Sequence, residues 1–386
     1  MKTNCSVFLF VFCLLSSNVT PQARATVITW TNTSGGVWSL PSNWSPNQVP
    51  GSNDAVLVTL PGSYTIALDK TNVALSLAFG APVGSGVQTL LITNLLGIAS
   101  NTVVQGGGTM EITNSTGSFY SDGFVTVTSG GTLTAYAGYL DFFFKTTSLT
   151  VTNGGIVNSI GFPATYDSFL GITFPAATFD GPVFVANGGT LNASGGTGAL
   201  FAVGPGGILN VTSELFTALG TNQGTIHLTN AEFAIGNFQS QPSVPGLLNL
   251  PGGVITLSGT NSINAGSYFT NQGTVLQYSG SSTIYGAILD PSMGIVTNLG
   301  GSMLFEYFGT NLAGQYYAAS GAAIIFDGTD LQNSQTSNQM TLGANLSLGG
   351  PGEYQLASGY LYLPSGVATN LALACDTITL GPDFEG

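Results

Sequence analysis

The hydrophobic and polar positions of this chain follow a short phrase that recurs along much of its length. Alternating apolar residues lead into Asn or Ser and two glycines, and alternating apolar residues follow. Clear copies are Val125–Thr134, Leu149–Val157 and Val183–Asn192. Alternation with a period of two predicts half-buried β-strands, and the Gly-Gly step supplies the positive φ angles of a tight turn. The phrase therefore predicts pairs of short strands joined at a corner.

The spacing of these phrases predicts the architecture. They recur about every 24 residues, a length that suits one coil of a parallel β-helix. Each strand would then pair with its equivalents in the neighbouring coils, about 4.8 Å away, and Leu149, Val151 and Phe184 would point into a continuous core. We expect an all-β fold: a right-handed parallel β-helix, or β-solenoid, with an N-terminal cap.

Polar residues are expected at the corners and on the outer surface of this solenoid. Asn153, Asn187 and Asn298 stand at Gly-rich corners and could form hydrogen-bonded ladders there. Threonine pairs such as Thr126–Thr128 and Thr150–Thr152 resemble the outward arrays of ice-binding solenoids, but in the sequence they do not recur in register. We therefore interpret them as ordinary solvent-facing residues of strands.

Three segments differ in composition. Residues 1–25 have the charged start, the apolar stretch and the small-residue cleavage site of a secretory signal peptide. Residues 26–100 hold all three tryptophans and are expected to form a cap and the first coils. Residues 101–386 carry the solenoid repeats, and the strand pattern still runs at the last residues, so the solenoid could be truncated there.

Composition and charge restrict the compartment and the partners. Export by a bacterial signal peptide would make the mature chain secreted, extracellular or attached to the cell surface, and no later apolar stretch reaches the roughly 20 residues of a membrane span. Four Lys and Arg against 17 Asp and Glu exclude nucleic acid, which needs a cationic cluster. Cleavage would remove Cys5 and Cys13 and leave Cys375 alone, so no intramolecular disulfide is expected.

Parallel β-helices often carry enzymes that act on polysaccharides, so catalysis is one hypothesis for this chain. Glycoside hydrolysis needs two carboxylates about 5 to 10 Å apart, and the nearest approach in the sequence is Asp327 with Asp330. β-Elimination on uronates needs a base and a cation, for which Asp141 and Lys145 are the candidates. We interpret the first pair as a polar turn and Lys145 as a surface residue. A polysaccharide lyase or glycoside hydrolase is therefore the second hypothesis, behind a non-catalytic protein.

No metal or other cofactor is predicted. His227 is the only histidine, and it alternates with Ile226 and Leu228, so it faces solvent if these two face the core. One histidine cannot build a zinc site with a single distant cysteine. Calcium suits an acidic exported chain and is the one metal left open, although the Gly-Gly-x-Gly-x-Asp calcium-binding repeat is absent.

The tryptophans Trp30, Trp38 and Trp44 allow two interpretations. They could form the hydrophobic core of the cap, or they could be a platform on which sugar rings stack. Their order, Trp, Gly-Gly-x-Trp, Asn-Trp, then Val-Pro-Gly and Asp, resembles the start of large secreted bacterial β-solenoid proteins of the autotransporter-like and surface-adhesin-like kind. The resemblance implies an exported surface solenoid and does not imply an enzyme.

Together these features predict an exported, non-catalytic structural or adhesive protein at the cell surface or in the extracellular matrix. Extracellular polysaccharide or other cell-surface components are the expected partners. The alternatives are the polysaccharide-active enzyme and the stalk of a longer surface protein.

Overall fold

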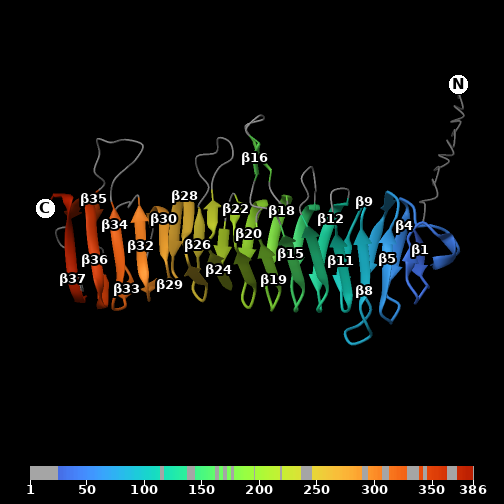
Figure 1. Ribbon diagram of the computed structural model, residues 1–386, viewed down its shortest axis with the longest axis horizontal. Coiled ribbons are helices and arrows are strands. Elements are labelled where there is room, and N and C mark those ends of the chain that lie inside the picture. Colours follow the sequence, from blue (N-terminus) through green and yellow to red (C-terminus); the bar gives the residue numbers. More distant parts are fainter. Residues whose placement is uncertain are drawn as a thin grey trace, which may run out of the picture.

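The computed structural model describes residues 25–113, 117–136, 144–160, 165–167, 172–174, 178–194, 196–217, 220–235, 246–288, 294–306, 313–327, 339–341, 346–362 and 372–385. The expected signal peptide lies outside these residues up to residue 24. The described chain forms a long rod of β-strands (Figure 1), and its strands pair in parallel with strands one coil away. The predicted all-β parallel solenoid is confirmed.

Three stacks of parallel strands form the sides of the rod, which we call faces 1, 2 and 3. Face 1 contains β1 (Thr26–Trp30), β4 (Asp54–Val58), β7 (Ser76–Phe79), β10 (Thr102–Gln105), β23 (Gly220–Asn222), β26 (Leu247–Asn249) and β35 (Gln339–Thr341). Face 2 contains β2 (Gly36–Val37), β5 (Tyr64–Leu68), β8 (Gln88–Ile92), β11 (Gly108–Ile112), β13 (Thr132–Tyr136), β15 (Ile156–Ile160), β19 (Thr190–Ala193), β21 (Ile208–Val211), β24 (Thr225–Thr229), β27 (Val254–Ser258), β29 (Thr274–Ser279), β31 (Ile295–Asn298) and β33 (Gln315–Ala318). Face 3 contains β6 (Asn72–Ala74), β9 (Leu95–Ile98), β22 (Glu214–Thr217), β25 (Glu232–Ile235), β32 (Gly301–Glu306) and β34 (Ala322–Asp327).

Longer strands bend round a corner and contribute to more than one face. These are β12 (Ser118–Thr128), β14 (Phe144–Val151), β18 (Thr178–Val185), β20 (Gly196–Val203), β28 (Asn261–Asn271), β30 (Ser281–Ile288), β36 (Ser347–Tyr362) and β37 (Ala372–Glu385). The remaining elements are the short turn η1 (Pro41–Asn43), β3 (Trp44–Ser45), which pairs antiparallel with β1, and the antiparallel hairpin of β16 (Thr165–Asp167) and β17 (Ile172–Phe174).

Alternation along each strand builds the core. Leu149 and Val151 are buried, as predicted, and their partners on the next coil are Val183 and Val185, which are buried too. The prediction for Phe184 is wrong: it lies between these two valines, points outward and is 42% exposed. Only one set of alternating residues can face the core, so the two valines exclude the phenylalanine from it.

The recurring Asn-Gly-Gly step is explained by the corner between faces 1 and 2. Asn153 and Gly154 have positive φ angles of 49° and 76°. The φ of Gly155 is not positive, but a Cβ there would lie 2.2 Å from the carbonyl oxygen of Val127 on the preceding coil. The first two positions thus require a left-handed backbone and the third requires a residue without a side chain. The backbone joins successive coils here, since Asn153 N donates to the carbonyl of Asn187 at 2.9 Å.

The predicted asparagine ladder at the corners exists, but it is formed by other residues. Inside the rod, Asn222 Nδ2 donates to Asn249 Oδ1 at 2.8 Å, and Asn249 Nδ2 donates to Asn271 Oδ1 at 2.7 Å. Asn298 is also fully buried, and its amide donates to the carbonyl of Ala323 on the next coil at 2.8 Å. These amides satisfy backbone groups at two corners, the first three at the end of face 1 and Asn298 at the end of face 2, where strand pairing is interrupted.

Candidate functional site

Face 2 carries a regular outer surface. In its described strands from β5 to β33 the residues pair one to one, and the single register shift lies between Leu257 and Ser258, near the end of β27. Because side chains alternate along each strand, outward residues of successive coils fall into columns that run along the rod.

One of these columns consists almost entirely of β-branched residues, and we call it the threonine column. Its members are Thr65, Thr89, Thr109, Thr132, Ile156, Thr190, Ile208, Thr225, Val254, Thr274 and Ile295. This column contains single threonines, whereas the sequence prediction concerned Thr-x-Thr pairs. That prediction is wrong on face 1, where Thr126 of one pair is the partner in register of Thr150 of another. The connections between coils differ in length, so this alignment cannot be seen in the sequence. It becomes visible only when the strands are paired.

A second column lies two residues further along each strand, and we call it the amide column. Its members are Thr134, Asn158, Asn192, Asn210, His227 and Thr256. Asn210 Nδ2 donates to Asn192 Oδ1 at 2.7 Å, and Asn192 Nδ2 donates to Asn158 Oδ1 at 2.7 Å. Asn158 Nδ2 in turn donates to Thr134 Oγ1 at 3.1 Å. The column is thus a line of hydrogen-bonding groups that orient one another.

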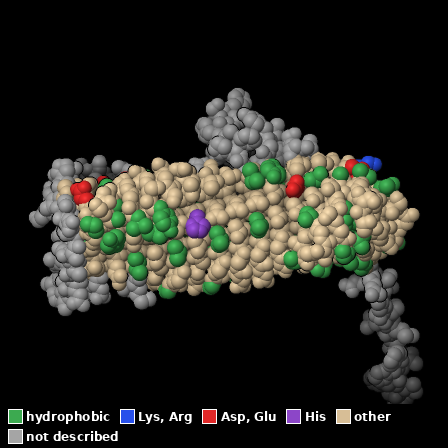
Figure 2. Space-filling view, turned by 60° about the horizontal axis from the view of Figure 1, so that its bottom comes forward, with side chains coloured by type: hydrophobic (Ala, Val, Ile, Leu, Met, Phe, Trp, Pro, Cys, Tyr) green, Lys and Arg blue, Asp and Glu red, His purple; other side chains and the backbone are tan. Residues whose placement is uncertain are grey.

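His227 lies in the amide column, and its side chain is on the outer side of the strand as its alternation with Ile226 and Leu228 predicts. Ile226 and Leu228 beside it are buried, and the imidazole is half-buried on the outer side. Its Nδ1 lies 2.5 Å from Oγ1 of Thr256 on the next coil. Figure 2 shows this histidine in the middle of a surface of uncharged side chains.

Formal charge is almost absent from face 2. Among the outward residues of its described strands from β5 to β33, Glu111 is the only one with a formal charge when histidine is neutral, although the whole chain has a net charge of −13. The described strands of face 2 therefore present an almost uncharged outer surface.

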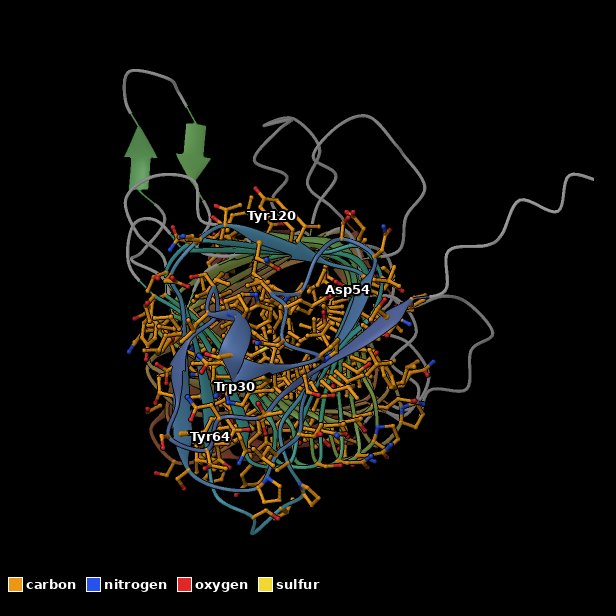
Figure 3. The ribbon with its side chains drawn as sticks, turned by 90° about the vertical axis from the view of Figure 1, so that its right-hand side faces the viewer. Trp30, Asp54, Tyr64 and Tyr120 are labelled. Carbon is orange, nitrogen blue, oxygen red and sulfur yellow. The ribbon has the colours of Figure 1, made fainter. Side chains whose placement is uncertain are left out.

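The three tryptophans are buried at the N-terminal end of the rod (Figure 1). Trp30, Trp38 and Trp44 are 0%, 1% and 3% exposed. Trp44 meets Trp30 and Trp38 edge to face, with ring centroids 4.9 and 4.7 Å apart, and its Nε1 donates to the carbonyl of Trp38 at 2.8 Å. In the view along the rod, Trp30 lies at the capped end between the strands that carry Asp54 and Tyr64 (Figure 3). Rings without an exposed face cannot stack on a sugar, so the geometry favours the cap-core interpretation.

Of the acidic candidates, only Asp327 has a described position. Asp327 ends β34, and its partner in register is Glu306 at the end of β32, one coil earlier. Asp330 and Asp141 lie outside the described residues. Lys145 is part of β14, but its side chain lies outside the described part. The pair of Glu306 and Asp327 was not recognised in the sequence; a signal for it is the equal distance of the two acids from the starts of their strands.

Burial and the neighbouring Asp327 raise the pKa of Glu306 above its ordinary value. Tyr285 and Asn264 precede these acids in the same column of face 3. Two carboxyl groups on adjacent strands, one of them with a raised pKa, have the chemistry of an acid and base pair.

In the described part of the chain, no three or more His, Cys, Asp and Glu side chains are grouped so that they could hold a metal ion. Nor does any helix in that part have the length and apolar character needed to cross a membrane.

Comparison with known proteins does not assign the chain to a family. No protein-family model, curated protein sequence or solved structure matches it.

Proposed function

We propose that the mature chain is an exported, non-catalytic structural or adhesive rod that acts at the cell surface or in the extracellular matrix and contacts carbohydrate. The observation that carries this proposal is the repetition of the same outward groups in register along face 2. A repeated surface favours many weak, identical contacts, whose combined strength far exceeds that of one contact.

Three further features support this proposal. The signal-like N-terminus and the resemblance of residues 30–54 to surface-adhesin-like solenoids point to export. The near absence of cations argues against nucleic acid. Hydroxyl and amide groups, which predominate on face 2, are the groups that hydrogen-bond sugar hydroxyls.

The experiment is an array of plant, algal and bacterial polysaccharides probed with the mature protein, with and without Ca²⁺. Both retention of the protein and release of new reducing or unsaturated sugar ends are measured. Retention without release is the expected result. Release of new sugar ends would overturn the non-catalytic proposal. Retention that depends on Ca²⁺ would show that calcium, the one metal left open by the sequence, takes part in binding.

A second candidate function, a polysaccharide-active enzyme, is favoured by one observation: Glu306 and Asp327 are stacked on adjacent coils, about one strand spacing of 4.8 Å apart at the backbone. This spacing is compatible with the separation of carboxyl groups in glycoside hydrolases. If this candidate is correct, Glu306→Gln and Asp327→Asn each abolish the release of sugar ends, while Glu111→Gln on face 2 does not.

The third alternative, the stalk of a longer surface protein, predicts a different result on the same array. A stalk holds an active module away from the surface and needs no ligand of its own. It therefore predicts neither retention nor release.

A further inference from the structure

Face 2 places two columns of different chemistry side by side, and we propose that they form a docking surface for an uncharged, insoluble linear polysaccharide of flat ribbon shape, such as a β-1,4-linked glucan. This inference rests on the proposed function and deepens it, because it names the surface and the class of ligand.

The geometry of the face suits a polymer. Groups within each column repeat once per coil, at about 4.8 Å, and the two columns are about 7 Å apart because they lie two residues apart on each strand. No bulge interrupts the register between β5 and β24. A flat chain can therefore meet the same groups many times without the rod having to bend.

The chemistry of the two columns matches the two kinds of surface on a sugar ribbon. Pyranose rings in such a ribbon expose C–H groups on their faces and hydroxyl groups along their edges. Methyl groups of the threonine column, such as those of Ile156 and Ile295, which are 37% and 39% exposed, would cover the C–H faces. Each amide in the ladder has two N–H hydrogens and uses one of them on its neighbour, so Asn158, Asn192 and Asn210 can offer the second to a hydroxyl.

The charge distribution selects a neutral occupant. A polyuronate would gain no attraction from a face whose described strands from β5 to β33 carry Glu111 as their only formal charge, and the net charge of −13 would repel it. A cationic polymer would be drawn to the acidic surfaces instead of face 2. Only an uncharged polymer takes its binding energy from the groups that this face presents.

The test compares two matched double variants. Thr190→Lys with Thr225→Lys places long charged side chains on the threonine column of face 2. Thr126→Lys with Thr150→Lys makes the same chemical change on face 1, where the two threonines are neighbours in register. All four threonines are half-buried strand residues, so both double variants carry a similar folding penalty. Circular dichroism and urea unfolding establish that each variant is folded.

Binding isotherms on insoluble β-1,4-glucan give the result. The face 2 variant is expected to raise Kd about tenfold or more, and the face 1 variant to leave Kd unchanged. Equal losses in both variants, or a loss only in the face 1 variant, would overturn the assignment of the surface while leaving the adhesive function intact.

The class of ligand is tested by the same proteins on other surfaces. Retention on polyuronates but not on neutral glucans would overturn the neutral class and still support an adhesive solenoid. Thermal hysteresis in ice suspensions without retention on glucan would show that the threonine column orders water instead. No retention on any polysaccharide would overturn the inference and its parent proposal together.

Discussion

Asn192 lies 34 residues beyond Asn158 in the chain, yet its amide nitrogen donates to the side-chain oxygen of Asn158 at 2.7 Å. The next amide in the same column, Asn210, follows after only 18 residues and makes the same bond at the same length. The solenoid therefore keeps the outer register of face 2 constant while the connections between coils vary. This constancy is the structural basis of a repeated contact surface.

The asparagine ladder inside the rod and the asparagines of the amide column on its surface should differ in their contribution to stability. Asn249→Ala leaves Asn222 and Asn271 without a side-chain partner in the core, and we expect a loss of about 3 kcal/mol in the free energy of unfolding. Asn192→Ala breaks equivalent bonds where water can replace them, and about 1 kcal/mol is expected. Urea unfolding measures both, and equal losses would contradict the placement of the two ladders.

The third position of the corner phrase should not tolerate a methyl group. Gly155→Ala would bring a Cβ to 2.2 Å from the carbonyl oxygen of Val127, so a loss of about 3 kcal/mol or more is expected. The control is Gly84→Ala, at a position with a φ of +84° but no atom within 4 Å, where backbone strain alone is about 1 kcal/mol. A smaller effect at Gly155 than at Gly84 would argue against close stacking of the coils at this corner.

Glu306 should make stability depend on pH. Burial and Asp327 raise its pKa in the folded chain, so the folded state holds this proton more tightly than the unfolded state. Its contribution is fully present below the ordinary glutamate pKa and is lost as pH rises through the raised value. Glu306→Gln should therefore stabilise the protein at neutral pH and flatten the pH dependence above about pH 4.

The measurement for this prediction is the urea midpoint as a function of pH, with Glu111→Gln on face 2 as the control for removing a carboxylate. If the control flattens the profile as much as Glu306→Gln does, the pairing of Glu306 with Asp327 has no influence on stability.

The tryptophans should behave as core residues. Because Trp30, Trp38 and Trp44 are at most 3% exposed, their emission is expected at short wavelength and should resist quenching by iodide. Bound polysaccharide should leave the emission unchanged. Strong quenching by iodide that added sugar prevents would instead support the interpretation of the tryptophans as a platform on which sugar rings stack.

Part of this structure is visible in the sequence because it is local. The alternation around Leu149 and Val151 predicts strands, and the Asn-Gly-Gly step predicts the corner between them. The prediction for Phe184 was wrong because the valines on both sides of it, Val183 and Val185, occupy the inward positions.

The other features of the structure depend on which residues of neighbouring coils are paired, and this register cannot be read from the sequence. Glu306 and Asp327 become neighbours only when β32 and β34 are aligned, and the asparagines of the amide column become neighbours only when long and short coils are stacked. Connections of unequal length conceal both alignments. Candidate sites on a solenoid therefore have to be sought across coils and not along the chain.

The central claim is that face 2 binds the polysaccharide. Oxidative footprinting of the mature protein, free and bound to insoluble β-1,4-glucan, tests it most directly, because it identifies the side chains that the bound polysaccharide covers and requires no mutation. Face 2 presents Tyr136, His227 and Tyr317, and face 1 presents Phe124 and Phe184, which are 63% and 42% exposed. The account predicts that binding protects the first group and leaves the two phenylalanines as reactive as in the free protein. Protection of Phe124 and Phe184 with unchanged labelling of the tyrosines and the histidine would contradict it.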